Sequence, residues 1–207
     1  MSLNIWLTFV AAAFVISGSP GPNMLLSLTH GIHHGLTRTF ATMLGLLSGL
    51  AIILTVSLGG LGAVLMTSTT VFVVVKYAGA VYLAYLGIRI WLTADTRLIT
   101  SGRPLAGGRL SRYRTGMLVS LSNPKAILFC LAFFPQFIDR RQPLARQAAI
   151  LLATFVIIET CWMLVYAGGG ARLATWLGTG NRMRWFNRAS GSVFMGAGVL
   201  LGFLRRP

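Results

Sequence analysis

The sequence has 207 residues, of which 55% are hydrophobic and 10% charged, with a mean hydropathy of +0.74. A soluble domain carries about 25% charged residues, so the composition excludes a soluble globule. The net charge of +15 would suit nucleic-acid binding. However, the cations stand between long apolar segments, where basic residues orient membrane helices and meet lipid headgroups. We therefore expect a membrane protein without a nucleic-acid partner.

Six segments are long and apolar enough to cross a bilayer, which takes about 20 residues per helix. In chain order they cover residues 3 to about 29, 39–66, 70–92, 115–138, 147–171 and 187–204. The expected fold class is therefore all-α, a polytopic membrane protein of six transmembrane helices in one transporter domain. A basic linker, residues 94–114, joins a first three-helix unit, residues 1–93, to a second unit, residues 115–207.

The arginines between and beyond the six segments predict an orientation. Alternating loops place ten of them on one side and five on the other. The richer side holds Arg38, Arg97, Arg103, Arg109, Arg112, Arg114, Arg172, Arg182, Arg184 and Arg188. The positive-inside rule puts this side in the cytoplasm, with both chain termini on the opposite side.

The first segment is interrupted by a run of small, polar and proline residues. The run comprises Ser17, Gly18, Ser19, Pro20, Gly21, Pro22 and Asn23. Proline removes a backbone N–H and disfavours helix in the residue before it. Unpaired backbone groups within a bilayer must face protein or a water-filled cavity, so the break is predicted to line a cavity. Because proline suits the first position of a helix, free N–H groups of Met24 and Leu25 would favour an anion there.

The fourth segment repeats this arrangement at Asn123-Pro124-Lys125. A lysine follows the proline here, where Asn23 follows Pro22 in the first segment. Two facing helix starts of this kind are predicted to hold a carboxylate. The alternative is that the prolines only kink packed helices.

The two breaks belong to a weak internal repeat. Residues 22–28 resemble residues 124–130, and residues 78–83 resemble residues 190–195. Each match relates helices that are three apart. Since three is an odd number, the two units would cross the membrane in opposite senses, which is the inverted-repeat plan of many secondary transporters.

Glu159 lies inside the fifth segment with apolar neighbours on both sides. A charged group at the centre of a bilayer costs at least about 2.5 kcal/mol, so this carboxyl is predicted to exchange a proton or to pair with an amine. The alternative is a structural ion pair with Lys76 or Lys125.

Metal or cofactor chemistry is not expected. His30, His33 and His34 have no carboxylate or thiolate near them in sequence, so contact with lipid headgroups is favoured over zinc. Cys130 and Cys161 lie inside apolar segments, where cysteine usually serves as a small apolar side chain.

Several of these motifs together resemble the LysE/RhtB family of bacterial amino-acid exporters, over nearly the whole chain. They are residues 19–23, 45–49, 76–83, 86–88, 122–126 and 133–138. The resemblance implies an inner-membrane protein that expels amino acids and related metabolites, driven by the proton-motive force. It is strongest to the branch that exports homoserine, homoserine lactone and threonine. Many members carry an acid at the position of Leu50, which leaves Glu159 as the only deep acid and argues against a lysine or arginine cargo.

The predicted function is export of small neutral amino acids, with no enzymatic activity. The cargo carboxylate would lie at the helix starts of Pro22 and Pro124 and at Lys125, while Glu159 would bind the amino group or carry the coupling proton. The remaining predicted binding residues, which line the two breaks, are Ser17, Ser19, Pro20, Gly21, Asn23 and Asn123. The expected partners are the cargo and membrane lipid, with a homodimer left open. An intramembrane lipid-modifying enzyme and a passive metabolite channel are the alternatives.

Overall fold

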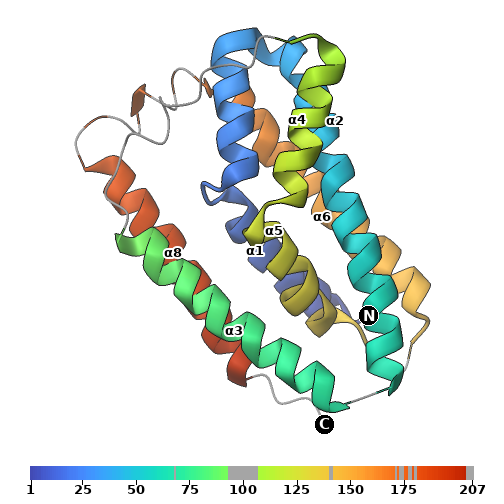
Figure 1. The fold of residues 1–207 in the computed structure, drawn as a ribbon. Helices are drawn as coiled ribbons and strands as arrows, with labels where there is room; N and C mark the ends of the chain where they lie inside the picture. Colours follow the sequence, from blue (N-terminus) through green and yellow to red (C-terminus); the bar gives the residue numbers. More distant parts are fainter. Residues whose placement is uncertain are drawn as a thin grey trace.

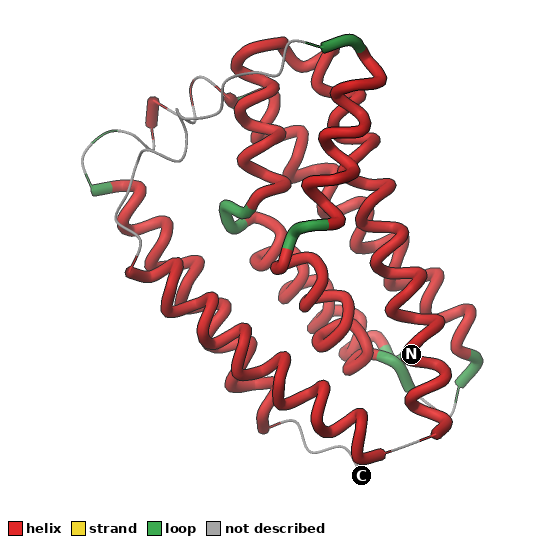
Figure 2. The backbone as a smooth tube through the Cα atoms, viewed as in Figure 1, coloured by secondary structure: helices red, strands yellow, loops and turns green. Residues whose placement is uncertain are grey.

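The computed structural model describes residues 1–67, 69–92, 107–139, 142–170, 172, 175–176, 179 and 181–203. The described chain is helical, with no strand among these residues (Figure 2). Its elements are α1 (Leu3–Gly18), α2 (Pro22–Thr67), α3 (Thr69–Leu92), α4 (Arg109–Leu121), α5 (Pro124–Leu128), η2 (Phe129–Phe133), η3 (Phe134–Phe137), α6 (Leu144–Gly168) and α8 (Arg182–Phe203).

Two of these helices are long and apolar enough to cross a membrane by length and composition. One covers Pro22–Ser57 within α2, and the other is α6. Leu3–Gly18 and Tyr77–Leu92 are shorter apolar helices. The expected all-helical architecture is therefore confirmed for the described residues, and the length and composition of these two stretches agree with a membrane protein.

α2 is a helical hairpin, because the chain reverses direction at Gly35 (Figure 1). Gly35 has φ +73° and ψ 166°, a conformation with positive φ that suits glycine because it has no Cβ. It divides α2 into a first arm, residues 22–34, and a second arm, residues 36–67. Across the turn, His30 Nδ1 and Thr42 Oγ1 are hydrogen-bonded at 2.6 Å. The first predicted segment therefore extends beyond its expected end near residue 29, and the second begins before residue 39.

α1 and α6 run parallel to each other. Trp6 Nε1 donates to Thr154 Oγ1 at 3.1 Å, and Trp162 Nε1 donates to the carbonyl of Phe14 at 2.9 Å. The contacts advance by eight residues on both helices, so the two helices run in the same direction.

The second arm of α2 and α4 are also parallel and lie very close together. A Cβ added at Gly45 would lie 2.0 Å from the Tyr113 carbonyl oxygen, and one at Gly49 would lie 2.8 Å from that of Met117. Glycine therefore allows direct backbone contact here, as small residues do between membrane helices.

α3 and α8 form an antiparallel pair along one side of the molecule (Figure 1). A Cβ at Gly87 would lie 2.7 Å from the Gly191 carbonyl oxygen, and one at Gly198 would lie 2.7 Å from that of Ala80. The contact positions fall from 87 to 80 along α3 as they rise from 191 to 198 along α8, so the two helices run in opposite directions. This pair contacts the remaining helices mainly through η2 and α1.

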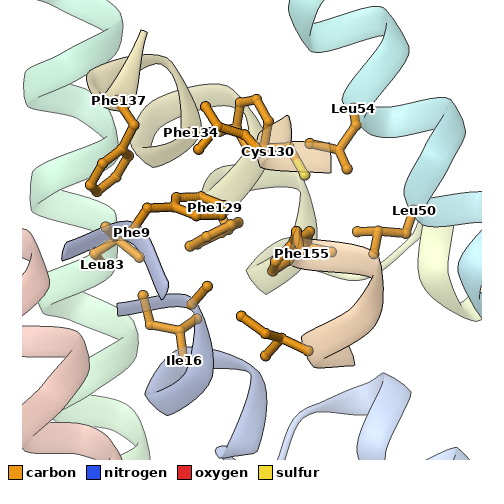
Figure 3. Packing of buried hydrophobic residues seen from close by; sticks show 14 of the residues in the cluster. Phe9, Ile16, Leu50, Leu54, Leu83, Phe129, Cys130, Phe134, Phe137 and Phe155 are labelled. Carbon is orange, nitrogen blue, oxygen red and sulfur yellow. The ribbon is translucent and has the colours of Figure 1, made fainter. Parts of the chain in front are cut away.

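Aromatic side chains from several elements form the core around which these helices pack (Figure 3). Phe129 and Phe155 stack at a centroid distance of 4.6 Å, and Phe9 meets Phe137 edge-on at 5.1 Å. η2 is a π-helix, so its backbone hydrogen bonds differ from those of an α-helix. Within η2 the Cys130 carbonyl accepts a hydrogen bond from Ser57 Oγ at 2.6 Å, which links η2 to α2.

The expected linker, residues 94–114, is partly helical. α4 begins at Arg109, so the last arginines of this stretch belong to a helix end, whereas residues 94–106 lie outside the described residues. Likewise α8 begins at Arg182, five residues before the sixth predicted segment. Arginine is a good helix former, and a membrane helix can continue into the headgroup region. Hydropathy detects only the apolar part of such helices.

Alanine substitution on α8 tests the close contact with α3. A Cβ at Gly191 would lie 2.5 Å from the Gly87 carbonyl oxygen, whereas one at Gly196 would meet no atom of the described residues within 4 Å. We expect Gly191→Ala to lower stability by about 1–3 kcal/mol through overpacking. The matched Gly196→Ala should leave stability unchanged or raise it, because alanine favours helix by about 1 kcal/mol. Thermal unfolding of both variants in detergent measures the difference, and equal melting temperatures would contradict the packing.

Candidate functional site

The two predicted helix breaks lie against each other in the middle of the molecule (Figure 2). α1 ends at Gly18, and α2 begins at Pro22. α4 ends at Leu121, and α5 begins at Pro124. Both interruptions therefore fall where the prolines predicted them, on segments about a hundred residues apart in sequence.

Hydrogen bonds between polar side chains join the two breaks. Asn123 Nδ2 donates to Asn23 Oδ1 at 2.9 Å, and both residues are 3% exposed. Lys125 Nζ donates to the Ser19 carbonyl oxygen and to Ser19 Oγ, each at 2.9 Å. Lys125 thus neutralises the end of α1, where helix carbonyls carry partial negative charge.

Gly21 gives the Lys125 side chain room to cross the first break. A Cβ at Gly21 would lie 3.1 Å from Lys125 Cδ and 3.5 Å from Nζ. On its other side the Lys125 ammonium lies 5.6 Å from the centre of the Phe194 ring on α8. A larger residue at position 21 would have to displace the lysine.

A small cavity lies at this junction. Its lining residues come from α1, α2, α5, η2 and α6 and the two breaks, and they are Ile16, Gly21, Asn23, Met24, Asn123, Lys125, Ala126, Phe129, Phe155 and Glu159. The volume open to the centre of a water molecule is about 10 Å³, enough for about one water. An amino acid would require the cavity to widen.

Glu159 enters the cavity from α6 and is 5% exposed. Its Oε2 atom has no hydrogen-bond partner within the described part of the chain, and the same holds for Ser17 Oγ and Asn23 Nδ2. Ser17 lies beside the Glu159 carboxyl without the geometry of a hydrogen bond. Buried polar atoms are nearly always paired in native proteins, so this set is suited to a polar ligand.

Two aromatic residues on the Glu159 face of α6 hold the end of α1. Tyr166 donates its hydroxyl to the Gly18 carbonyl at 2.8 Å, and Trp162 donates to the Phe14 carbonyl. Residues 159, 162 and 166 share one face of a helix. Sequence reasoning missed this role for Trp162 and Tyr166, although their spacing from Glu159 was a usable signal.

At the two helix starts, backbone N–H groups that were expected to be free have hydrogen-bond acceptors. Leu25 N–H donates to the Gly21 carbonyl at 2.9 Å, so the expectation that this N–H is free is wrong. Lys125 N–H is capped by Asn123 Oδ1 at 3.1 Å. Because the carbonyl of the residue before the proline can accept an ordinary helical bond, and because asparagine is a strong cap, these donors find partners locally. The Lys125 ammonium is therefore the positive group that the described side chains place at the junction.

The other predicted residues lie at the two breaks, outside the lining of the cavity. Ser17 and Ser19 are buried at the end of α1. Pro20 is half-buried, and Pro22 and Pro124 are exposed, so the prolines shape the breaks without lining the cavity. The Lys76 side chain, the alternative partner for Glu159, lies outside the described residues.

The sequence of this chain matches one protein family almost from end to end. The family described as LysE type translocator matches residues 5–204. The chain belongs to this family. It is 35% identical over 206 residues to the homoserine/homoserine lactone efflux protein of Salmonella typhimurium, covering 99% of each chain.

Other LysE family relatives are similar over the same length. A leucine efflux protein of Salmonella typhimurium is 32% identical over 208 residues, covering 98% of this chain and 96% of the relative. An uncharacterized membrane protein of Vibrio cholerae is 34% identical over 202 residues, covering 97% and 98%. No solved structure gives a significant match. The membrane-type fold is consistent with the efflux function of these relatives. The chain is an amino-acid exporter of the LysE family and not an enzyme.

A double-mutant cycle tests the link between the two breaks. Asn23→Ala and Asn123→Ala should each destabilise the protein, and their effects should couple by about 1 kcal/mol, because each removes the same buried hydrogen bond. Reversible unfolding in mixed micelles measures the coupling. Ser122 is the control for position 123, since its exposed side chain donates to the Leu118 carbonyl at 2.8 Å. A coupling between Asn23 and Asn123 no larger than that between Asn23 and Ser122 would refute the contact.

Proposed function

We propose that this chain exports small neutral amino acids or their derivatives, such as homoserine, homoserine lactone or threonine, across the bacterial inner membrane, driven by a proton gradient. The observation that carries the proposal is the cavity between the two helix breaks, which one lysine and one glutamate line together. The names of the efflux relatives in the LysE family support the cargo class.

The cavity has the chemical groups that an amino-acid zwitterion needs. The Lys125 ammonium would leave Ser19 and bind the α-carboxylate, aided by the side-chain amides of Asn23 and Asn123. The unpartnered Glu159 carboxyl oxygen would accept from the α-ammonium group. Burial strengthens such charge-assisted bonds, which are about twice as strong as neutral ones.

The remaining cavity wall favours a small uncharged cargo side chain. Met24, Ala126, Phe129 and Phe155 supply apolar surface. Glu159 is the one carboxyl among the described residues that line the cavity, so it cannot serve both an α-ammonium and a side-chain cation. A lysine or arginine cargo would therefore leave a buried charge unpaired, at a cost of several kcal/mol.

The helix directions support six spans arranged as two inverted three-helix repeats. In a six-span chain that alternates direction, the first and fifth helices are parallel, as are the second and fourth, while the third and sixth are antiparallel. α1 with α6, the second arm of α2 with α4, and α3 with α8 have these relations.

The contacts between the breaks are also reciprocal. If Pro22 is equivalent to Pro124, then Gly21 corresponds to Asn123, and Asn23 corresponds to Lys125. The contact of Gly21 with Lys125 and the bond between Asn123 and Asn23 are then images of each other. A two-fold relation of this kind lets one repeat rock against the other around a fixed central site, which gives alternating access.

Replacement of Glu159 tests the proton coupling. Glu159→Gln should abolish uptake driven by a pH gradient into proteoliposomes that hold the protein, measured with labelled homoserine, threonine and leucine. If Glu159 carries the proton, exchange of cargo across the membrane without a gradient should persist in this variant. If Glu159 binds the amino group, exchange should be lost as well.

The control is Asp139→Asn, because Asp139 lies outside the cavity and its backbone N–H and carbonyl bond to the Gln147 side chain. This variant should keep both activities. Gradient-driven transport that survives in Glu159→Gln would remove Glu159 from the mechanism. Wild-type flux down a cargo gradient that ignores pH would instead indicate a passive channel.

Growth of cells that overproduce the protein tests the cargo class. Export should raise tolerance to toxic concentrations of homoserine, threonine or leucine relative to cells producing Lys125→Met, which keeps a long side chain but removes the ammonium. Tolerance to lysine should not change, because its side-chain cation would lack a partner in the cavity. Wild-type cells that gain no tolerance to any of the three neutral amino acids would contradict the assignment.

A further inference from the structure

A second group of cationic and imidazole side chains gathers where the α2 hairpin meets the start of α4. We call His30, His34, Arg38 and Arg112 the hairpin cluster. The first two come from the first arm of α2, Arg38 lies near the start of the second arm, and Arg112 lies in the first turn of α4. Arg112 is one turn before Gly116, where an added Cβ would lie 2.2 Å from the Thr42 carbonyl oxygen.

Two polar atoms of the hairpin cluster are buried without a partner among the described residues. They are His34 Nε2 and Arg112 Nε. Other groups of the cluster are bonded, since His30 Nδ1 pairs with Thr42 and Arg112 Nη1 donates to the Gly107 carbonyl at 2.7 Å. Arg112 lies within electrostatic range of both histidines. Arg112 Nε–H is a donor, and His34 Nε2–H is a donor in one neutral tautomer and in the charged ring, so each of the two atoms can donate to an anion.

The described part of the chain supplies no acid at this end. Its two carboxyl side chains are Glu159, in the central cavity, and Asp139, beside Gln147 at the start of α6. Exposed His33 and Arg109 add further basic groups beside the hairpin cluster. The counter-charge must therefore come from another molecule or from residues outside the described part.

Exposed apolar side chains lie next to the hairpin cluster. They are Ile32, Leu36, Phe40 and Leu110, which are 37%, 39%, 47% and 59% exposed. Basic groups at helix ends with apolar surface beside them are suited to a molecule that has both an anionic head and hydrocarbon chains. A free phosphate ion or a small zwitterionic cargo would not need the apolar surface.

We propose that the hairpin cluster binds the phosphate of an anionic phospholipid in the cytoplasmic leaflet. Arg112 and His34 donate to the phosphate oxygens, Arg38 adds long-range attraction, and the apolar side chains contact the acyl chains. Basic pockets between membrane helices on the cytoplasmic side bind phospholipid headgroups in this way. This inference is independent of the cargo, because it uses no residue of the central cavity.

Lipid titration of the purified full-length protein tests the proposal. Native mass spectrometry would follow binding of phosphatidylglycerol, with phosphatidylcholine as the zwitterionic comparison. We expect saturable binding of phosphatidylglycerol that is about tenfold weaker in Arg112→Gln, as loss of a charged hydrogen bond implies. The matched control is Arg114→Gln, which removes the same charge from an exposed position of α4 and should change the affinity by less than about twofold.

Arg112→Lys is a second variant that keeps the positive charge and is less prone to a folding defect. Because it loses the planar guanidinium donors, it should bind phosphatidylglycerol about fivefold more weakly than the wild type. His34→Gln should also weaken binding. Equal loss in Arg112→Gln and Arg114→Gln would overturn the site in favour of general surface charge. Full competition by millimolar inorganic phosphate would overturn the lipid assignment in favour of a free-anion site. Failure of either kind would leave amino-acid export unaffected, so the two proposals can be judged separately.

Discussion

A lipid bilayer offers no water to the backbone groups of a broken helix, so each interruption in this protein must find its partners within the protein or in a water-filled cavity. The two breaks meet this requirement by facing each other. The ammonium of Lys125 occupies the carbonyl end of α1 through Ser19, and Asn123 bonds to Asn23 across the junction. Other contacts hold the two breaks in position. α6 fixes the end of α1 through Tyr166, and the close glycine contacts of α2 with α4 position the second break. The prolines create the need for partners, and the polar side chains beside them supply those partners.

The junction of the two breaks also brings the buried polar and charged groups together around one cavity. Lys125 is already bonded in the structure, whereas the Glu159 carboxyl, the Ser17 hydroxyl and the Asn23 amide retain unpartnered atoms around a cavity of about one water molecule. In the proposed cycle, a cargo that replaces Ser19 as the partner of Lys125 would remove one of the two links between the breaks and leave the Asn123–Asn23 bond. Loss of that link would connect cargo binding physically with conformational change.

Few of the charged side chains that the structure describes lie at the central cavity. Most of the described arginines lie at one end of the helices, with the hairpin cluster and the start of α8; there Arg188 is 5.8 Å from the ring centre of Trp91. The centre contains one described cation and one described acid, Lys125 and Glu159. An ion inside a bilayer is costly and an ion at its surface is not, so the basic end can contact lipid headgroups while the centre keeps a single described cation and a single described acid.

Composition and local chemistry by themselves determined the all-helical, membrane-type class and the two breaks. Apolar length identified the helices, and proline geometry located both breaks within a residue or two of where α2 and α5 begin. The isolated carboxyl of Glu159 marked the candidate site, because burying it without a function is expensive. Tertiary structure alone decided which groups meet. The lysine bonds to Ser19, and Trp162 and Tyr166 clamp the end of α1. These contacts join residues more than a hundred positions apart. Local sequence encodes backbone preference and depth in the membrane, but such contacts depend on how helices cross, which is set by packing over the whole chain.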